Sequence, residues 1–116
     1  MVSQLQSIFN VVWERAKDKR KSVDRAPILA SGVYGDRCMY RSPDGLKCFA
    51  GALIPDEAYR PEWEGKMSVN VPCFDQFQEA RTLIRQLQVI HDDDHPDNWE
   101  YELRVVAKRF GLEVPQ

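Results

Sequence analysis

Apolar residues recur at helical spacing in three stretches of this chain, which predicts three amphipathic helices. The first covers residues 3–20, where Ser3 can cap the amino end and a cationic tail suits the carboxyl end. The second covers residues 73–91, and the third runs over residues 98–110 with Gly111 placed to end it. The positions expected to face the core are Leu5, Ile8, Phe9, Val12, Trp13, Ala16, Phe74, Phe77, Ala80, Leu83, Ile84, Leu87, Ile90, Trp99, Leu103, Val106, Ala107 and Phe110.

Between the first two helices the pattern changes to that of extended chain. Residues 28–50 read as strands, and residues 67–71 read as a further short strand. The Pro-Asp-Gly run at residues 43–45 is typical of a tight turn, which predicts a hairpin centred on it. The expected fold class is therefore α+β, with a small antiparallel β-hairpin or sheet packed against three main α-helices. The whole chain, residues 1–116, is expected to form one domain.

The composition does not favour nucleic-acid binding, membrane insertion or secretion. The formal net charge is −2, so the chain lacks the strong basic field of most nucleic-acid-binding proteins. No apolar run reaches the length of a membrane span, and the first residues resemble no secretory leader. These features predict a cytoplasmic protein that has no contact with a membrane. With an odd number of cysteines, three, and no secretory leader, the thiols are expected to be reduced.

A basic strip lies at the end of the first predicted helix. Binding of phosphates by this strip would be weak and salt-sensitive, so nucleic-acid binding is one alternative function. No aromatic residues alternate with these cations, and a solvated helix end also explains them, so a nucleic acid is not the expected partner. The cations are Arg15, Lys17, Lys19, Arg20, Lys21 and Arg25.

One set of residues has the chemical types needed for thiol catalysis. Cys48, His91 and Asp92 could act as a nucleophile, its base and the group that orients the base. A histidine at a helix end could also lower the pKa of a nearby thiol. Against this, no nucleophile signature surrounds Cys48, and cysteine is often a small buried apolar residue. A thiol-dependent enzyme is therefore an alternative hypothesis.

A zinc site is the metal-dependent form of the same alternative. Its candidate ligands are Cys38, Cys48, Cys73, His91 and His95. Nine residues separate Cys38 from Cys48, whereas zinc knuckles use much shorter spacings. Several distant segments would have to converge, so the sequence predicts no cofactor as its first choice.

Another group of residues is typical of a protein-binding surface. In the expected hairpin Arg41 and Lys47 lie opposite each other, and like charges in that position are unfavourable unless a carboxylate is near. Asp56, or an acidic partner, can supply that carboxylate. Tyr59 and Trp63 lie in a proline-rich acidic stretch, where aromatic residues can anchor a partner or fold back over the hairpin.

The stretch from residue 38 to residue 110 resembles a family of small uncharacterised phage, prophage and bacterial proteins. These proteins have a YRxPDGxKCxxGxLIPD motif with alanine directly after the cysteine, followed by His-Asp at a helix end and a Trp-led final helix. This sequence departs from the pattern at Phe49, where the family has alanine. The matching residues are Tyr40, Arg41, Pro43, Asp44, Gly45, Lys47, Cys48, Gly51, Leu53, Ile54, Pro55, Asp56, His91, Asp92 and Trp99.

The resemblance implies a context and carries no catalytic residues with it. A phage-like protein of this size often binds a host factor or inhibits a defence system. The expected function is therefore a small accessory protein, in a bacterium or a phage-infected bacterial host, that binds and modulates a host or defence protein. Inhibition is the expected effect, and the sequence leaves open whether the chain also forms a homo-oligomer.

Overall fold

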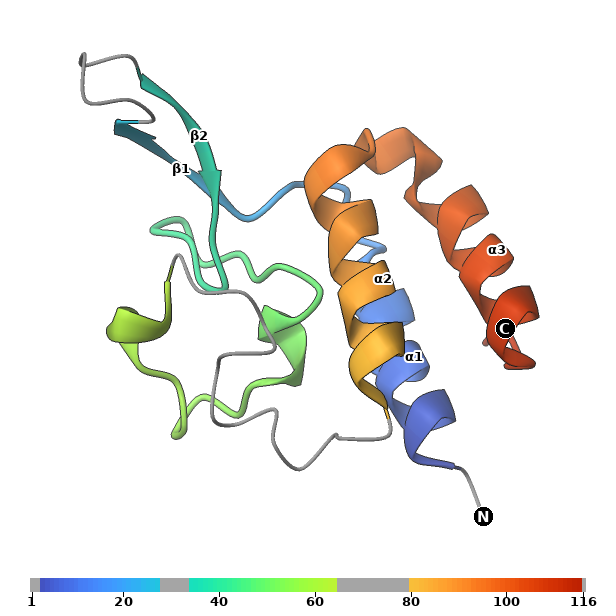
Figure 1. The fold of residues 1–116 in the computed structure, drawn as a ribbon. Helices are drawn as coiled ribbons and strands as arrows, with labels where there is room; N and C mark the ends of the chain where they lie inside the picture. Colours follow the sequence, from blue (N-terminus) through green and yellow to red (C-terminus); the bar gives the residue numbers. More distant parts are fainter. Residues whose placement is uncertain (1–2, 28–33, 65–79, 116) are drawn as a thin grey trace.

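Three helices pack together and supply most of the core (Figure 1). The structure is a computed structural model, and it describes residues 3–27, 34–64 and 80–115. Helix α1 spans Gln4–Arg15, α2 spans Arg81–Asp93 and α3 spans Trp99–Phe110. The buried apolar side chains of the helices are Ile8, Phe9, Val12, Trp13, Leu83, Ile84, Leu87, Ile90, Trp99, Leu103, Val106 and Ala107.

Helix α1 begins where the sequence predicts and ends five residues early. The hydroxyl of Ser3 accepts a hydrogen bond from the backbone N–H of Gln6 at 3.1 Å, as an N-cap does. At the other end, the Arg15 guanidinium donates to the carbonyl oxygens of Asp18 at 2.8 Å and Arg20 at 2.7 Å. This side chain satisfies carbonyl groups that a longer helix would have satisfied itself, so the chain turns away after Arg15.

The two carboxyl-terminal helices are joined by the short 3₁₀ turn η5 (Pro96–Asn98). Gly111 ends α3 in the left-handed conformation, with φ of 69°, as the sequence predicts. Asp97 and Glu100 have the spacing of a capping box in the sequence, but this box does not form. Instead, His95 Nδ1 accepts the backbone N–H of Asp97 at 3.1 Å, and Asn98 precedes α3 without a capping side chain.

Two hydrogen bonds between the Gln6 side-chain amide and the Glu113 backbone hold the ends of the described chain together. The Gln6 side chain donates to the Glu113 carbonyl oxygen at 2.8 Å and accepts the Glu113 N–H at 2.8 Å. The segment after α3 thereby lies along α1.

The predicted hairpin around residues 43–45 is present only as a turn. Gly45 has φ of 85°, and Arg41 pairs with Lys47 in an isolated bridge, so the expected register is confirmed. No strand continues on either side of the bridge in this described segment. The chain instead enters the 3₁₀ turns η1 (Gly51–Leu53) and η2 (Pro61–Trp63). Backbone N–H groups that a strand would have paired are bound by side chains from Glu64 and Gln88.

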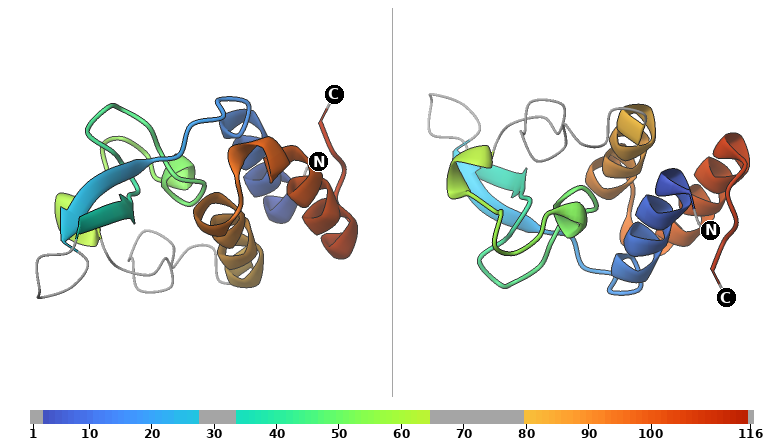
Figure 2. Two further views of the ribbon diagram at one scale, coloured as in Figure 1. Left: turned by 90° about the horizontal axis from the view of Figure 1, so that it is seen from above. Right: turned by 90° about the horizontal axis from the view of Figure 1, so that it is seen from below.

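The expected α+β arrangement is wrong, because no sheet packs against the helices in the described residues. Strands β1 (Val23–Pro27) and β2 (Tyr34–Cys38) pair only with each other, as an antiparallel ribbon. Figures 1 and 2 show this ribbon standing away from the helices. The body is a three-helix bundle to which the irregular segment 39–64 is attached. The strand expected at residues 67–71 and the first turns of the expected 73–91 helix lie outside the described residues.

Candidate functional site

His91 is the centre of a buried polar contact between α2 and the segments before β1 and after β2. Its side chain is 0% exposed. Nε2 accepts the backbone N–H of Ser22 at 3.0 Å, so the ring proton lies on Nδ1, which donates to Asp92 Oδ1 at 2.9 Å. Burial lowers the pKa of His91 below its ordinary value, against a smaller opposite effect of Asp92. The imidazole is therefore neutral and fully hydrogen-bonded at neutral pH.

Two aromatic side chains enclose His91. The Trp99 ring stacks on the imidazole at 5.4 Å between centroids, and its Nε1 donates to the Ile90 carbonyl oxygen at 3.2 Å. Phe49 meets both rings edge-on, at 4.8 Å from Trp99 and 5.3 Å from His91. The segment 39–64 is anchored to the bundle by Phe49, the residue at which this sequence departs from the motif. This cluster therefore has a structural role.

Cys48 lies beside this cluster but does not form a catalytic pair with His91. Its side chain is 1% exposed, and Sγ accepts the backbone N–H of Gly51 at 3.2 Å. Burial raises the pKa of the thiol to about 12. Both nitrogens of His91 already have partners, so neither is available to take the thiol proton. The geometry does not favour the thiol-dependent alternative.

A labelling experiment tests this interpretation of Cys48. In a variant with Cys38→Ser and Cys73→Ser, we expect Cys48 to react with a disulfide probe far more slowly when folded than in urea. A pKa of about 12, against an ordinary 9.0, reduces the thiolate fraction about 1,000-fold at neutral pH. Rapid labelling of the folded protein that is lost in His91→Ala would contradict this expectation and favour the enzyme.

The candidate metal ligands are not gathered in the part of the chain that the structure describes. No three His, Cys, Asp or Glu side chains there are grouped as metal ligands would be. His95 is exposed at the start of η5, whereas His91 and Cys48 are buried. Cys73 and the side chain of Cys38 lie outside the described residues, so a zinc site that uses them stays a hypothesis.

Four of the five residues predicted to bind a partner form one polar cluster, which we call the Arg41 cluster: Arg41, Lys47, Asp56 and Tyr59. Arg41 Nη1 contacts Asp56 Oδ1 at 2.5 Å, and Lys47 Nζ contacts the same oxygen at 3.3 Å. The guanidinium also lies over the Tyr59 ring, 5.0 Å from its centroid. Asp56 thus relieves the repulsion between the two cations, and they lower its pKa below the ordinary value. Its side chain remains 76% exposed.

Trp63, the fifth predicted residue, is only 7% exposed and meets the Tyr59 ring edge-on at 6.5 Å. It is a core residue rather than an exposed anchor. The neighbouring Glu64 is the residue that sequence reasoning missed. Its carboxylate accepts the N–H groups of Tyr40 at 2.9 Å and Arg41 at 3.0 Å, and the Tyr59 hydroxyl at 2.5 Å. Its acidic neighbourhood in the sequence gave no signal that it would point inward.

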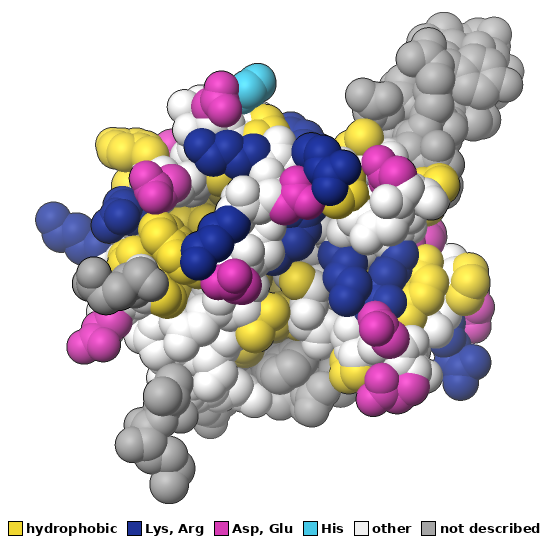
Figure 3. Space-filling model, turned by 180° about the vertical axis from the view of Figure 1, so that it is seen from behind, with side chains coloured by type: hydrophobic (Ala, Val, Ile, Leu, Met, Phe, Trp, Pro, Cys, Tyr) yellow, Lys and Arg dark blue, Asp and Glu magenta, His cyan; other side chains and the backbone are white. Residues whose placement is uncertain are grey.

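A groove lies between α1 and the Arg41 cluster, and we call it the Val11 groove. Its volume is about 520 Å³, and it is lined by Asn10, Val11, Glu14, Arg15, Lys47 and Ala52. Val11 is 43% exposed, although it is an aliphatic side chain in a helix. Figure 3 looks onto the face with α1, where Lys and Arg side chains lie among apolar patches. The groove therefore offers an apolar floor beside cationic groups.

The basic strip is largely used by the protein itself. Arg15 binds backbone carbonyl oxygens, and Lys21 Nζ donates to the Asp92 carbonyl oxygen at 3.1 Å. Lys17 pairs with Glu14 at 2.9 Å. Arg20 pairs with Asp18 at 2.8 Å, and this contact lowers the pKa of Asp18. These contacts reduce the charge available for phosphates, so they do not favour the nucleic-acid alternative.

Comparison with known proteins gives no further information about the function of this site. Searches against family models, curated proteins and solved structures found no match to the chain. Within the described residues, no helix combines the length and apolar character that crossing a membrane requires. The function has to be argued from the side chains and surfaces of this structure.

Proposed function

We propose that this chain is a non-enzymatic interaction domain that binds a host or defence protein and modulates it, with inhibition as the expected effect. The observation that carries the binding role is the Val11 groove with the Arg41 cluster at its rim. The target class rests on the sequence resemblance to phage and prophage proteins.

The two walls of the groove come from segments far apart in the sequence. One wall is α1, and the other is the turn that carries Lys47 and Ala52. Arg15 joins them, because its Nε donates to the Lys47 carbonyl oxygen. A groove built this way is formed before a partner arrives, so binding does not require the ordering of a loop.

The lining specifies the chemistry of the partner. Val11, Ala52 and the aliphatic stem of Lys47 suit an apolar side chain. Arg41 and Lys47 share one exposed carboxylate, Asp56, whereas the other nearby carboxylate, Glu64, is turned onto backbone N–H groups and the Tyr59 hydroxyl. The two cations therefore face outward with a single exposed carboxylate between them. A partner segment with an apolar anchor next to an Asp or Glu side chain would fit both features. We prefer binding to catalysis because the groove is open to a partner, whereas the candidate nucleophile Cys48 is buried and hydrogen-bonded.

Affinity purification of the tagged protein from bacterial lysate, read by quantitative mass spectrometry, tests the proposal. We expect one near-stoichiometric protein with the wild-type chain. Val11→Asp and Lys47→Glu should each reduce its recovery about tenfold or more, because both changes lie at the groove. Tyr101→Asp is the matched control, because Tyr101 is 68% exposed on α3 and outside the groove.

Three outcomes separate the hypotheses. A partner lost in both groove variants and kept by the control supports the proposal. A partner kept by all variants contradicts the assignment to the Val11 groove. An empty purification contradicts the binding role, and rapid labelling of Cys48 would then make the enzyme the better hypothesis. Thermal melting of each variant checks that the fold is retained.

A further inference from the structure

The charges of α2 run against its helix dipole. The amino end of a helix favours acidic side chains and the carboxyl end favours basic ones. In α2 no acidic residue occupies the first turn, and Arg81 and Arg85 lie in the amino-terminal part. Its carboxyl end has Asp92, Asp93 and Asp94. Asp92 accepts a hydrogen bond from His91, but the charges of Asp93 and Asp94 are unfavourable at this end of the dipole of α2.

Helix α3 places further acidic side chains beside the acidic carboxyl end of α2, and further basic side chains beside its basic amino end. It has the usual order, with Glu100 and Glu102 in its first turn and Lys108 and Arg109 in its last. Because a short turn joins α2 to α3, the two helices run antiparallel and pack together (Figure 1). The amino end of α2 therefore meets the carboxyl end of α3, and Arg109 Nη1 donates to Gln86 Oε1 at 2.5 Å.

A groove with a volume of about 470 Å³ lies between α2 and α3. Arg85 and Arg109 line its basic end, and Asp94 and Glu102 line its acidic end. Between them lie apolar side chains, of which Val89 is 49% exposed. We call this surface the bipolar groove. Both of its ends gather like charges within one molecule, which is unfavourable unless the opposite charge comes from outside.

We propose that the bipolar groove is the interface of a homodimer with a two-fold axis through its apolar middle. Val89 lies four residues from Arg85 and five from Asp94, so the exposed valine is close to the midpoint of the charges. A two-fold axis there places the basic end of each copy against the acidic end of the other. The valines of the two copies meet at the axis.

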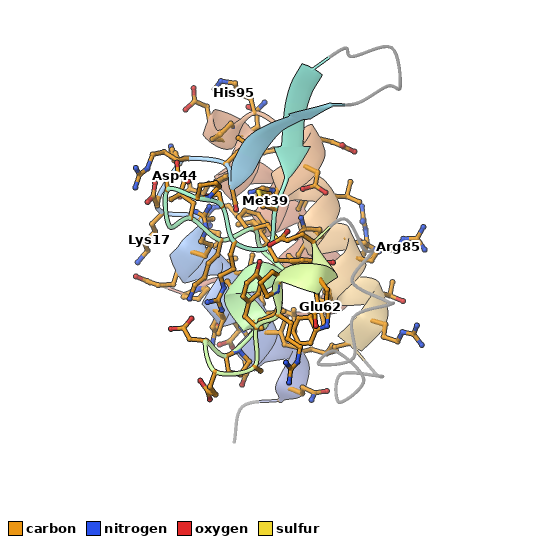
Figure 4. The ribbon with its side chains drawn as sticks, turned by 90° about the vertical axis from the view of Figure 1, so that its left-hand side faces the viewer. Lys17, Met39, Asp44, Glu62, Arg85 and His95 are labelled. Carbon is orange, nitrogen blue, oxygen red and sulfur yellow. The ribbon has the colours of Figure 1, made fainter. Side chains whose placement is uncertain are left out.

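This surface is distinct from the Val11 groove. The two grooves have no lining residue in common. Figure 4 shows Lys17, which pairs with Glu14 of the Val11 groove, and Arg85 of the bipolar groove on opposite sides of the body. A dimer through α2 and α3 therefore leaves the Val11 groove of each copy open. The failure of one proposal does not decide the other.

The size of the surface predicts a weak dimer. Helices α2 and α3 have 13 and 12 residues, which gives each a length of about 18 to 20 Å. Two such helices side by side present about 400 Å² per copy, or about 800 Å² in total, which is below the size of stable specific interfaces and in the range of weak, transient ones. We therefore expect a reversible dimer with a dissociation constant on the order of 10 to 100 µM.

Sedimentation equilibrium of the full chain over about 2 to 500 µM, which brackets that dissociation constant, tests the proposal. We expect the mass to rise from 13.5 kDa toward twice that value. The dimer should weaken in about 0.5 M NaCl, because its charged ends are partly exposed. A monomer at every concentration in low salt would overturn the proposal.

Charge exchange tests the geometry. Variant one has Arg85→Glu and Arg109→Glu, and variant two has Asp94→Lys and Glu102→Lys. Each should be monomeric alone, because both ends then have the same charge. Mixed in equal amounts, the two should form a heterodimer, which no unspecific loss of folding would produce. Lys17→Glu is the control and should dimerise like the wild type.

Other outcomes reject the dimer. If variants one and two dimerise like the wild type, the charged ends do not form the interface. If the chain stays monomeric but a captured protein is lost in variant one and kept by Lys17→Glu, the groove belongs to that partner instead. Circular dichroism of each variant confirms that the helices are retained.

Discussion

Trp99→Ala is expected to lower the free energy of unfolding by about 4 kcal/mol, the largest loss among single truncations of the core. Trp99 is 0% exposed, stacks on His91 and meets Phe49 edge-on. Its removal leaves a cavity and removes one of the two hydrogen bonds that the Ile90 carbonyl oxygen accepts, the one from Nε1. Since domains of this size are stable by only about 5 to 15 kcal/mol, this single change should remove between about a quarter and four fifths of the free energy of unfolding.

Urea denaturation followed by circular dichroism measures the effect. Tyr101→Ala is the matched control, because Tyr101 is in the same helix and 68% exposed. It should change the free energy of unfolding by less than about 0.5 kcal/mol. A loss below about 1 kcal/mol for Trp99→Ala would show that the cluster around His91 is not the centre of the core.

Gly51→Ala is expected to lower the free energy of unfolding by about 3 kcal/mol or more, although it adds a single methyl group. A Cβ on Gly51 would lie 2.3 Å from the Tyr40 carbonyl oxygen, far inside contact distance. The backbone of Tyr40 cannot easily move away, because its N–H is bound by the Glu64 carboxylate at 2.9 Å. The change therefore forces apart two backbone segments that hold the segment 39–64 together.

Two other glycines provide the controls for this variant. Gly45 and Gly111 have positive φ values of 85° and 69°, and no atom lies within 4 Å of a Cβ placed on either. Alanine there adds only conformational strain, about 1 to 2 kcal/mol. If Gly51→Ala costs no more than these two variants in the same denaturation experiment, the close approach of Tyr40 does not govern this site.

The features that were predicted from sequence are those fixed by neighbours along the chain. The apolar stripe with Phe9 and Val12 identified the buried face of α1, and Leu103 and Val106 identified that of α3. The left-handed conformation of Gly111 was predictable because a helix end has few ways to satisfy its last carbonyl groups. The pairing of Arg41 with Lys47 followed from the length of the turn alone.

The features that were missed depend on side chains that arrive from distant segments. A hairpin was predicted because Tyr40 and its neighbours suit a strand, yet Glu64 and Gln88 bind the backbone groups that a second strand would have bound. The early end of α1 depends in the same way on where Arg15 finds carbonyl oxygens. Local sequence pattern contains no information about such partners.

The candidate site shows the same division. Arg41 and Lys47 were expected to meet a carboxylate, either from Asp56 or from an acidic partner, and the structure places Asp56 there. The Val11 groove was not predicted, because it requires the turn to lie against α1. The bipolar groove could not be recognised either. Its charges are visible in the sequence, but their gathering depends on the antiparallel packing of α2 and α3.

The contact between Gln6 and Glu113 has a consequence for how the chain folds during synthesis. These residues are 107 positions apart, and α1 buries Phe9 and Val12 in the same core as Leu103 and Val106. At typical ribosomal rates the last helix follows the first by about 5 to 20 s. During that interval the apolar side chains of α1 cannot yet pack against α3. During synthesis the nascent amino-terminal helix therefore exposes apolar side chains of the kind that chaperones bind.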